Sequence, residues 1–312
     1  MARNLIRRLC MAGASALAIL MAQGEAYSAT NSWSFVVPET VIWTAPNGGF
    51  YEMGASGAAG GKADTAGYTK KGGQGASVGG LAYLFAGQQL TIIVGGEGGY
   101  KYSSHYNRSN GGGGGGGSFI FYGLPGGIGK QTLMVAAGGG GGATVASAGV
   151  NAQPHSTRGG GYRGGANGYG GYSYSGDGGG SGAGVAGAGR NSTGNDCHGA
   201  PSILSFSTCE TAGGFGGGGG GAYGDPGAGG GGGGYSGGGG GYESGYGGGS
   251  STGRYFDANS WGQSQSKNGV VTIVDVSGAV VPEPSTWAQM AIGFGALGFM
   301  GVRRGKLKKA TA

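Results

Sequence analysis

The stretch GGGGGGGSFIF, residues 111–121, decides the fold, because seven consecutive glycines lead directly into residues typical of a β-strand. So much glycine ordinarily predicts disorder, since glycine loses the most backbone entropy on folding and has no side chain to bury. The chain contains 88 glycines, so the behaviour of such runs governs the whole molecule. Four further long runs follow, at Gly138–Gly142, Gly216–Gly221, Gly229–Gly234 and Gly237–Gly241.

These runs have an ordered alternative to disorder. Polyglycine can form the left-handed helix of polyproline II, which has three residues per turn, a rise of about 3.1 Å and no internal hydrogen bonds. Several such helices can pack side by side, because no Cβ keeps them apart and each N–H can donate to a neighbour's carbonyl. A bundle requires rods of similar length, each bounded by a non-glycine residue, and these runs meet that requirement. A flexible linker needs no such matching, but matched runs are also compatible with a linker.

The first half of the chain reads as β-strands. Short runs of aromatic and β-branched residues, bounded by Gly, Pro or Asn, indicate a sandwich. They are Trp33–Val37, Val41–Thr44, Phe50–Met53, Val78–Phe85, Leu90–Val94, Phe119–Tyr122 and Leu133–Val135. A last strand, Gly269–Val276, follows the glycine-rich part, so the chain is expected to return to its sheet. We therefore expect sandwich strands and the first glycine runs in residues 31–137, a glycine-rich insertion in 138–268 and a closing strand in 269–278.

Both ends of the chain resemble targeting segments. Arg3, Arg7 and Arg8 precede an apolar stretch, which is the order of a secretory signal peptide, assigned to residues 1–26. Near the other end, an apolar run over 286–302 would reach about 25 Å as a helix, just short of a typical hydrocarbon core. A basic cluster follows it, and by the positive-inside rule the preceding chain is then outside the cytoplasm. A generic tail anchor has the same order.

The motif before that apolar run is more specific. Pro282, Glu283 and Pro284, followed by Ser-Thr-Trp, the hydrophobic helix and the basic cluster, resemble the PEP-CTERM sorting signal, here over residues 281–309. The resemblance implies recognition of these three residues and cleavage by an exosortase in a Gram-negative bacterium that makes exopolysaccharide. The partners it implies are the exosortase and the secretion machinery, with the helix in the inner membrane before cleavage.

The glycine-rich part resembles a second family. Gly57–Lys62, Thr91–Gly98, the stretch 111–121 and Met134–Gly142 are similar, in order and in local sequence, to the glycine-rich extracellular region of anaplastic lymphoma kinase and leukocyte tyrosine kinase. The resemblance covers about residues 33–276. It implies an all-β fold, in which a TNF-like β-sandwich carries an inserted bundle of polyglycine II helices. It implies no kinase activity, because no kinase motif is present.

Charge gives no support for nucleic-acid binding. Of the 19 basic side chains, three lie in residues 1–26 and five in 285–312, whereas only one of the 13 acidic side chains lies in these segments. The remaining chain has 11 basic and 12 acidic side chains, so the high pI belongs to the targeting segments.

Cys197 and Cys209 are the two cysteines outside the signal peptide, and their 12-residue separation suits a disulfide in an oxidising compartment. Metal binding is the alternative, since Asp196 and His198 flank Cys197. With only two thiols and no Cys-x-x-Cys, the disulfide is favoured and no metal site is expected.

Enzymatic readings find little support. The three histidines, His105, His155 and His198, have no nucleophile motif nearby, and the glycine patterns lack the Gly-Lys-Ser/Thr ending of a phosphate loop. Arg158-Gly159-Gly160 and Arg163-Gly164-Gly165 resemble RNA-binding repeats, but are better read as glycine-rich loop. We expect no catalytic residues and no cofactor.

Tyrosines punctuate the glycine segments. Their rings could stack on sugar faces, but covering a glycine bundle that has few side chains of its own is the preferred interpretation. They are Tyr162, Tyr169, Tyr172, Tyr174, Tyr223, Tyr235, Tyr242 and Tyr246.

The sequence as a whole predicts an exported, exosortase-processed structural or adhesive protein of the cell surface or extracellular matrix, associated with exopolysaccharide in a biofilm or floc. The alternative is a specific glycan- or protein-binding module. A more distant alternative is ice binding, against which the missing strict Gly-x-x repeat argues.

Overall fold

The computed structural model describes residues 31–105, 109–123, 132–174, 176, 178–194 and 197–277. Within these ranges, Asn31–Ser277 forms one compact unit. The predicted signal peptide, sorting motif and hydrophobic helix lie outside the described residues. Inside them, no helix has both the length and the apolar character needed to cross a bilayer.

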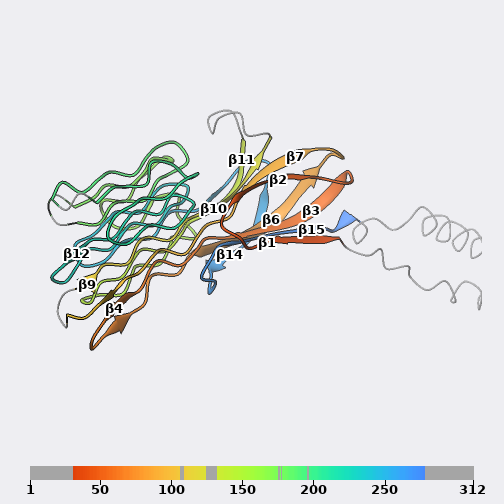
Figure 1. The fold of residues 1–312 in the computed structure, drawn as a ribbon. Helices are drawn as coiled ribbons and strands as arrows, with labels where there is room; N and C mark the ends of the chain where they lie inside the picture. Colours follow the sequence, from red (N-terminus) through yellow and green to blue (C-terminus); the bar gives the residue numbers. More distant parts are fainter. Residues whose placement is uncertain are drawn as a thin grey trace, which may run out of the picture. The chain divides into compact units, whose positions relative to one another are not determined.

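The prediction of an all-β fold is confirmed, since every named element in the described ranges is a β-strand. Two five-stranded antiparallel sheets are the largest of the four sheets in the described residues (Figure 1). The first sheet has the order β1 (Ser32–Phe35), β15 (Val270–Asp275), β3 (Gly49–Ser56), β6 (Ala76–Leu84) and β14 (Asp257–Gln263). The second has the order β13 (Ser251–Thr252), β11 (Thr132–Ala137), β10 (Ser118–Tyr122), β7 (Gln89–Ile93) and β2 (Thr40–Thr44).

The two sheets pack face to face as a sandwich. Along β3, Tyr51, Met53 and Ala55 are buried, whereas Phe50 and Glu52 between them are exposed. This alternation places every second side chain in the core. The shared core also contains, from both sheets, Trp43, Val78, Leu84, Leu90, Ile92, Val94, Ile120, Met134, Val135, Val271 and Ile273.

Strand register gives the sandwich two distinct ends. At one end, Ser56 of β3 lies opposite both Ser77 and Val270, and the glycine segments continue from the strands there. At the other end, Ser32 pairs with Val274, and the Asp275 N–H donates to the Asn31 carbonyl at 2.9 Å. The chain therefore enters and leaves this unit at the end opposite the glycine segments (Figure 1).

The glycine segments form hydrogen-bonded rods with a three-residue period, best seen in the buried run 111–117. Its residues 111, 114 and 117 donate N–H bonds to segment 216–222, residues 112 and 115 to segment 140–143, and residues 113 and 116 to segment 96–99, at 2.7–3.0 Å. Three residues per turn is the geometry of polyproline II.

The carbonyls of the same run accept from three further segments. Residues 113 and 116 accept from 61 and 58, residues 112 and 115 accept from 230 and 233, and residue 114 accepts from 214. Six segments therefore surround this central rod, and both backbone polar groups of residues 112–116 are satisfied although the rod is buried. The glycine run 111–117 is thus a rod that is hydrogen-bonded laterally to its neighbours.

A second buried cluster joins the rods to the sandwich. Ile93, Phe119 and Phe121 point away from the shared core and pack with Ala183 and Ile203 of the glycine-rich part. This explains why β10 is buried on both faces for four residues, unlike β3. The outer face of the second sheet is therefore covered at β10 and at Ile93 of β7, whereas Ile42 on the edge strand β2 remains exposed.

Additional strands appear in places where none was expected. Short pairs occupy the far part of the glycine region, and β14 lies within the range 138–268 that was assigned to the insertion. The short strands are β4 (Ala63–Thr65), β5 (Thr69–Lys70), β8 (Tyr102–Ser103), β9 (Ser109–Asn110) and β12 (Tyr223–Gly224). They form a three-stranded sheet of order β5-β4-β8 and a β9–β12 pair.

Candidate functional site

The predicted disulfide is present, and it closes a segment that helps to hold the rods against the sandwich. Cys197 and Cys209 are bonded, with their Cα atoms 5.2 Å apart. Cys197 is fully buried beside Ala222 and Ala228. Between the two cysteines, Ile203 enters the cluster on the outer face of the second sheet.

The histidines of the described ranges are not assembled into a site. His155 lies with its ring centroid 5.9 Å from that of Trp261, and His198 adjoins the disulfide. No cluster of three or more His, Cys, Asp or Glu side chains that could hold a metal occurs among the described residues.

The structure divides the eight tyrosines into four groups. Tyr235 and Tyr246 are half-buried, the former against the second cluster and the latter with its ring over Gly161. Tyr223 lies on β12, and Tyr242 donates its hydroxyl proton to the Asp225 carbonyl at 2.8 Å. Tyr169 is exposed and lies near Gly187. The remaining three, Tyr162, Tyr172 and Tyr174, share one surface.

That surface is a groove on the glycine-rich part, here called the Arg–Tyr groove. It has a volume of about 530 Å³. Tyr172 and Tyr174 lie in it with half or nearly half of their surface exposed, and Tyr162 adjoins it with 79% exposed. Its lining is Arg163, Tyr172, Ser173, Tyr174, Gly189, Arg190, Asn191 and Thr193.

Two arginines organise the groove by stacking on tyrosine rings. The Arg163 guanidinium carbon lies 4.7 Å from the ring centroid of Tyr174 and 5.1 Å from that of Tyr162. The Arg190 guanidinium carbon lies 4.8 Å from the ring centroid of Tyr172. Each contact is a cation–π interaction, typically worth about 0.5–1 kcal/mol at an exposed site. Aromatic faces and positive charge are therefore combined in one place.

Hydrogen bonds fix Arg163 further. Its Nε donates to the Tyr162 hydroxyl at 2.6 Å, and Nη1 donates to the Ser173 carbonyl. The Tyr172 backbone N–H donates to the Arg163 carbonyl at 2.8 Å, which joins the two chain segments that carry these side chains. The guanidinium is thus held in a defined plane.

A buried serine holds the other side of the groove. Ser181 Oγ donates to the Gly171 carbonyl at 2.7 Å and accepts the Arg190 N–H at 2.6 Å. Asn191 Oδ1 accepts the Gly199 N–H at 2.9 Å. The segments carrying Tyr172 and Arg190 are therefore cross-linked beneath the surface, so the groove is preformed.

The role of the arginines was not apparent in the sequence. Arg163 was read as part of an arginine–glycine loop, and Arg190 had no motif. They are 27 positions apart, and only the adjacency of Tyr162 and Arg163 could have indicated a stacked pair. Sequence spacing alone does not bring Arg190 to Tyr172.

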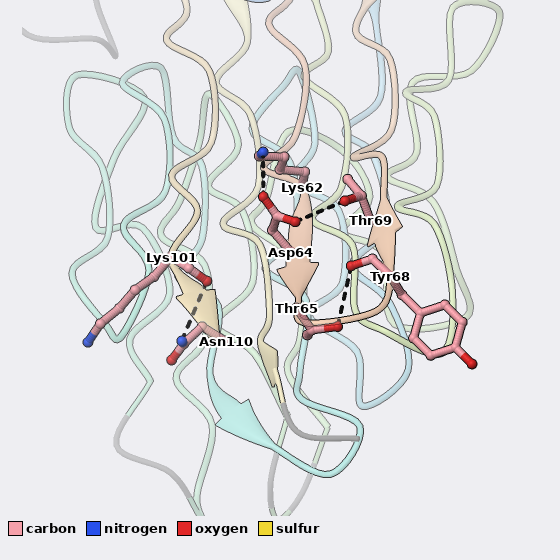
Figure 2. Close-up of polar contacts among 7 residues, drawn as sticks. All are labelled: Lys62, Asp64, Thr65, Tyr68, Thr69, Lys101 and Asn110. Carbon is pink, nitrogen blue, oxygen red and sulfur yellow. Dashed lines mark hydrogen bonds and ion pairs between the residues drawn. The ribbon is translucent and has the colours of Figure 1, made fainter. Parts of the chain in front are cut away.

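A second polar site lies on the three-stranded sheet and its neighbours (Figure 2). Asp64 Oδ2 is 2.7 Å from Lys62 Nζ, and its Oδ1 accepts the Thr69 hydroxyl at 2.9 Å. Lys62 Nζ also lies 4.3 Å from the Tyr100 ring centroid. These contacts lower the pKa of Asp64, chiefly through the Lys62 hydrogen bond, and the same bond raises the pKa of Lys62. The charged groups pair with each other, so this site offers less free charge than the groove.

Comparison of the chain with protein-family models gives no match, and comparison with curated proteins gives none either.

Proposed function

We propose that the chain is an exported structural or adhesive protein that associates with extracellular polysaccharide after processing at Pro282-Glu283-Pro284 by an exosortase. Its role is to present a surface and not to catalyse a reaction. The sandwich anchors the glycine rods, and the rods display surfaces that carry tyrosines and arginines. The two targeting resemblances carry the proposal of export and processing. Association with exopolysaccharide follows from the bacteria in which this sorting signal occurs.

The single structural observation that supports presentation is the pairing of Asn31 with Asp275. Because their backbones are hydrogen-bonded, the chain enters and leaves the unit at neighbouring points. The strand register puts these points at the end opposite the glycine segments. An attachment through the C-terminal segment would hold the sandwich toward the envelope and the rods outward.

The disulfide supports an exported location, because such bonds persist in oxidising compartments outside the cytoplasm.

We further propose that the sandwich is TNF-like, that the rods are polyglycine II helices and that residues 286–302 form the single hydrophobic helix. Two packed antiparallel sheets support the first assignment. The three-residue hydrogen-bond period of run 111–117 supports the second. The third rests on the apolar sequence alone.

The test follows the protein in a bacterium that makes an exosortase. We expect the wild-type chain outside the cell in a form shorter than its precursor, and the triple variant Pro282→Ala, Glu283→Ala, Pro284→Ala retained as the longer form in the membrane fraction. Immunoblots of cytoplasmic, membrane and extracellular polysaccharide fractions measure both. A wild-type chain that stays uncleaved in the cytoplasm would overturn the proposal.

The second candidate function is a specific glycan- or protein-binding module, and the Arg–Tyr groove is the observation that favours it. A purely structural protein would sediment with polysaccharide without saturating at one site. A binding module would saturate at one ligand per chain and lose its affinity when the groove is altered.

A further inference from the structure

We propose that the Arg–Tyr groove binds an acidic polysaccharide through the carboxylate groups of its sugars. This inference rests on the proposed association with extracellular polysaccharide and names the chemical class of the ligand.

The charge of the groove is uncompensated by its lining. Arg163 and Arg190 both line it, and the other lining side chains are neutral. The ion pairs found among the described residues, Lys62–Asp64 and Lys101–Glu210, involve neither arginine. A groove that has two guanidinium groups and no carboxylate among its described lining residues favours an anionic ligand.

The stacking leaves Arg190 suited to a planar oxyanion, whereas Arg163, whose Nε and Nη1 are already bonded, contributes mainly its positive charge. A tyrosine ring covers the face of a guanidinium, whereas its N–H groups point outward in the guanidinium plane. Carboxylates match this fork with two parallel hydrogen bonds, which are stronger than neutral ones. Arg190 has no side-chain hydrogen-bond or ion-pair partner within the described ranges, so its whole donor edge is available for such a bond.

The exposed rings and neutral polar groups suit a sugar. Tyr162 and Tyr174 expose 79% and 44% of their surface, so a pyranose ring can pack on their apolar faces. Asn191 and Thr193 line the same groove and carry groups that can bond to sugar hydroxyls. Charge for the carboxylate, rings for the sugar and polar groups for its hydroxyls therefore occur together.

Nucleic acid is the competing polyanion, and two observations disfavour it. The chain outside the targeting segments has 11 basic and 12 acidic side chains, so it lacks the extended positive surface that contacts many phosphates. The positive charge of the lining is confined to two arginines. Two arginines beside tyrosine rings are better suited to binding single carboxylate groups than to binding a continuous phosphate backbone.

The groove should bind without large rearrangement. Ser181 holds the backbones of Gly171 and Arg190, and Arg163 is fixed by Tyr162 and Ser173. Preorganised side chains lose less entropy on binding, so affinity is gained from few contacts.

The test uses the compact unit 31–277 with its disulfide formed, titrated calorimetrically with four polymers of similar length. They are polygalacturonate, its methyl ester, dextran sulfate and a single-stranded oligonucleotide. We expect saturable binding of polygalacturonate and loss of binding to the methyl ester, which keeps the sugar but not the charge. Binding of dextran sulfate that is weaker than binding of polygalacturonate would show that the site prefers carboxylate groups to sulfate groups. Equal binding of the ester, or tighter binding of dextran sulfate or the oligonucleotide, would overturn the proposal.

Variants locate the binding in the groove. We expect Arg190→Gln to weaken polygalacturonate binding about tenfold or more, the effect of losing one charge-assisted bond. Arg190→Lys keeps the charge but loses the fork, so it should also weaken binding. Arg254→Gln removes an exposed arginine outside the groove lining and should change affinity less than about twofold. Circular dichroism of each variant checks that it is folded.

These results are separable from those on export. If Arg190→Gln binds polygalacturonate as tightly as the wild type does, the groove proposal fails while export and processing stand. If the wild-type chain is never exported but the isolated unit binds polygalacturonate through Arg190, the proposed function fails and the groove chemistry stands.

Discussion

Gly114 donates its backbone N–H to the Gly219 carbonyl at 2.8 Å, and its own carbonyl accepts the N–H of Gly214 at 2.8 Å. The two partners belong to two neighbouring segments, which are joined to each other by the bond from the Gly218 N–H to the Gly214 carbonyl at 2.9 Å. The centre of the glycine-rich part is therefore made of backbone contacts, as the core of the sandwich is made of side chains. A side chain at Gly114 would occupy the space of a neighbouring rod.

We predict that Gly114→Ala destabilises the unit by about 1–3 kcal/mol or more, the usual cost of overpacking. A Cβ added there would lie closer than 3.0 Å to the Gly231 carbonyl oxygen, which is rigid backbone. Urea unfolding measures the loss. Gly262→Ala is the matched control, because a Cβ at that position meets no atom within 4 Å. Equal stability of the two variants would contradict the packed-rod structure.

We predict that Ile203→Ala lowers the free energy of unfolding by about 2–5 kcal/mol and that Ile203→Val lowers it by about 0.5–1.5 kcal/mol. Ile203 is fully buried with Phe119 and Phe121, so its loss opens a cavity between the rods and the second sheet. Leu204→Ala is the control, since that neighbouring side chain is 43% exposed. Thermal unfolding of the three variants ranks their stabilities. If Leu204→Ala destabilises the unit as much as Ile203→Ala does, Ile203 is not the buried side chain of this segment.

The sandwich strands were predictable because side chains specify them. In β3 and β6, apolar residues alternate with exposed ones, and their aromatic and branched composition is visible in the sequence. β14 was missed, because its sequence DANSWGQ has no such pattern. It is held by its pairing with β6 over Ala76–Leu81, a partner that is distant in the chain.

The sequence indicates that glycine rods form, but it does not indicate which segments pack against each other or where the groove lies. Run length and the absence of Cβ atoms indicate rods, but glycine carries no side-chain pattern that could name their partners. The six segments around 111–117 could not have been deduced. The groove depends on this arrangement, because Arg163 and Arg190 meet the same tyrosine-lined surface only after the rods have packed.

We predict that the Asp64 pKa lies below its ordinary value and rises toward it in both Lys62→Met and Thr69→Val, since each residue bonds to the carboxylate. A lowered pKa means that the ionised group stabilises the fold above pH 3.8, and that this contribution is lost as the pH falls through the folded-state pKa. The pH dependence has the opposite sign for Lys62. Its pKa is raised in the folded state, so the charged amine stabilises the fold below pH 10.5, and this contribution is lost as the pH rises through the folded-state pKa.

NMR titration of the Asp64 carboxyl carbon checks this prediction. Arg254→Gln serves as the control for a general change in charge, and it should leave the Asp64 titration where it is. A wild-type Asp64 that titrates at the ordinary value, or one that Lys62→Met does not move, would show that the contact does not persist in solution. The effect on global stability should be small, because the pair is only partly buried, with 37% of the Lys62 side chain and 23% of the Asp64 side chain exposed.

We predict that removing the disulfide, in the double variant Cys197→Ala, Cys209→Ala, lowers the free energy of unfolding by about 3 kcal/mol, the chain-entropy value for a loop of this size. Protection of backbone amides from hydrogen exchange should fall first in segment 198–208, because this loop is then free to lift Ile203 from the cluster on the second sheet. The rod 111–117 should keep its protection, since its hydrogen bonds run to segments outside that loop. Adding reductant to the wild type should reproduce the variant's stability, whereas adding it to the variant should change nothing. If exchange instead rises first in the rod, the disulfide stabilises the bundle itself, and the loop is not the weak point of the structure.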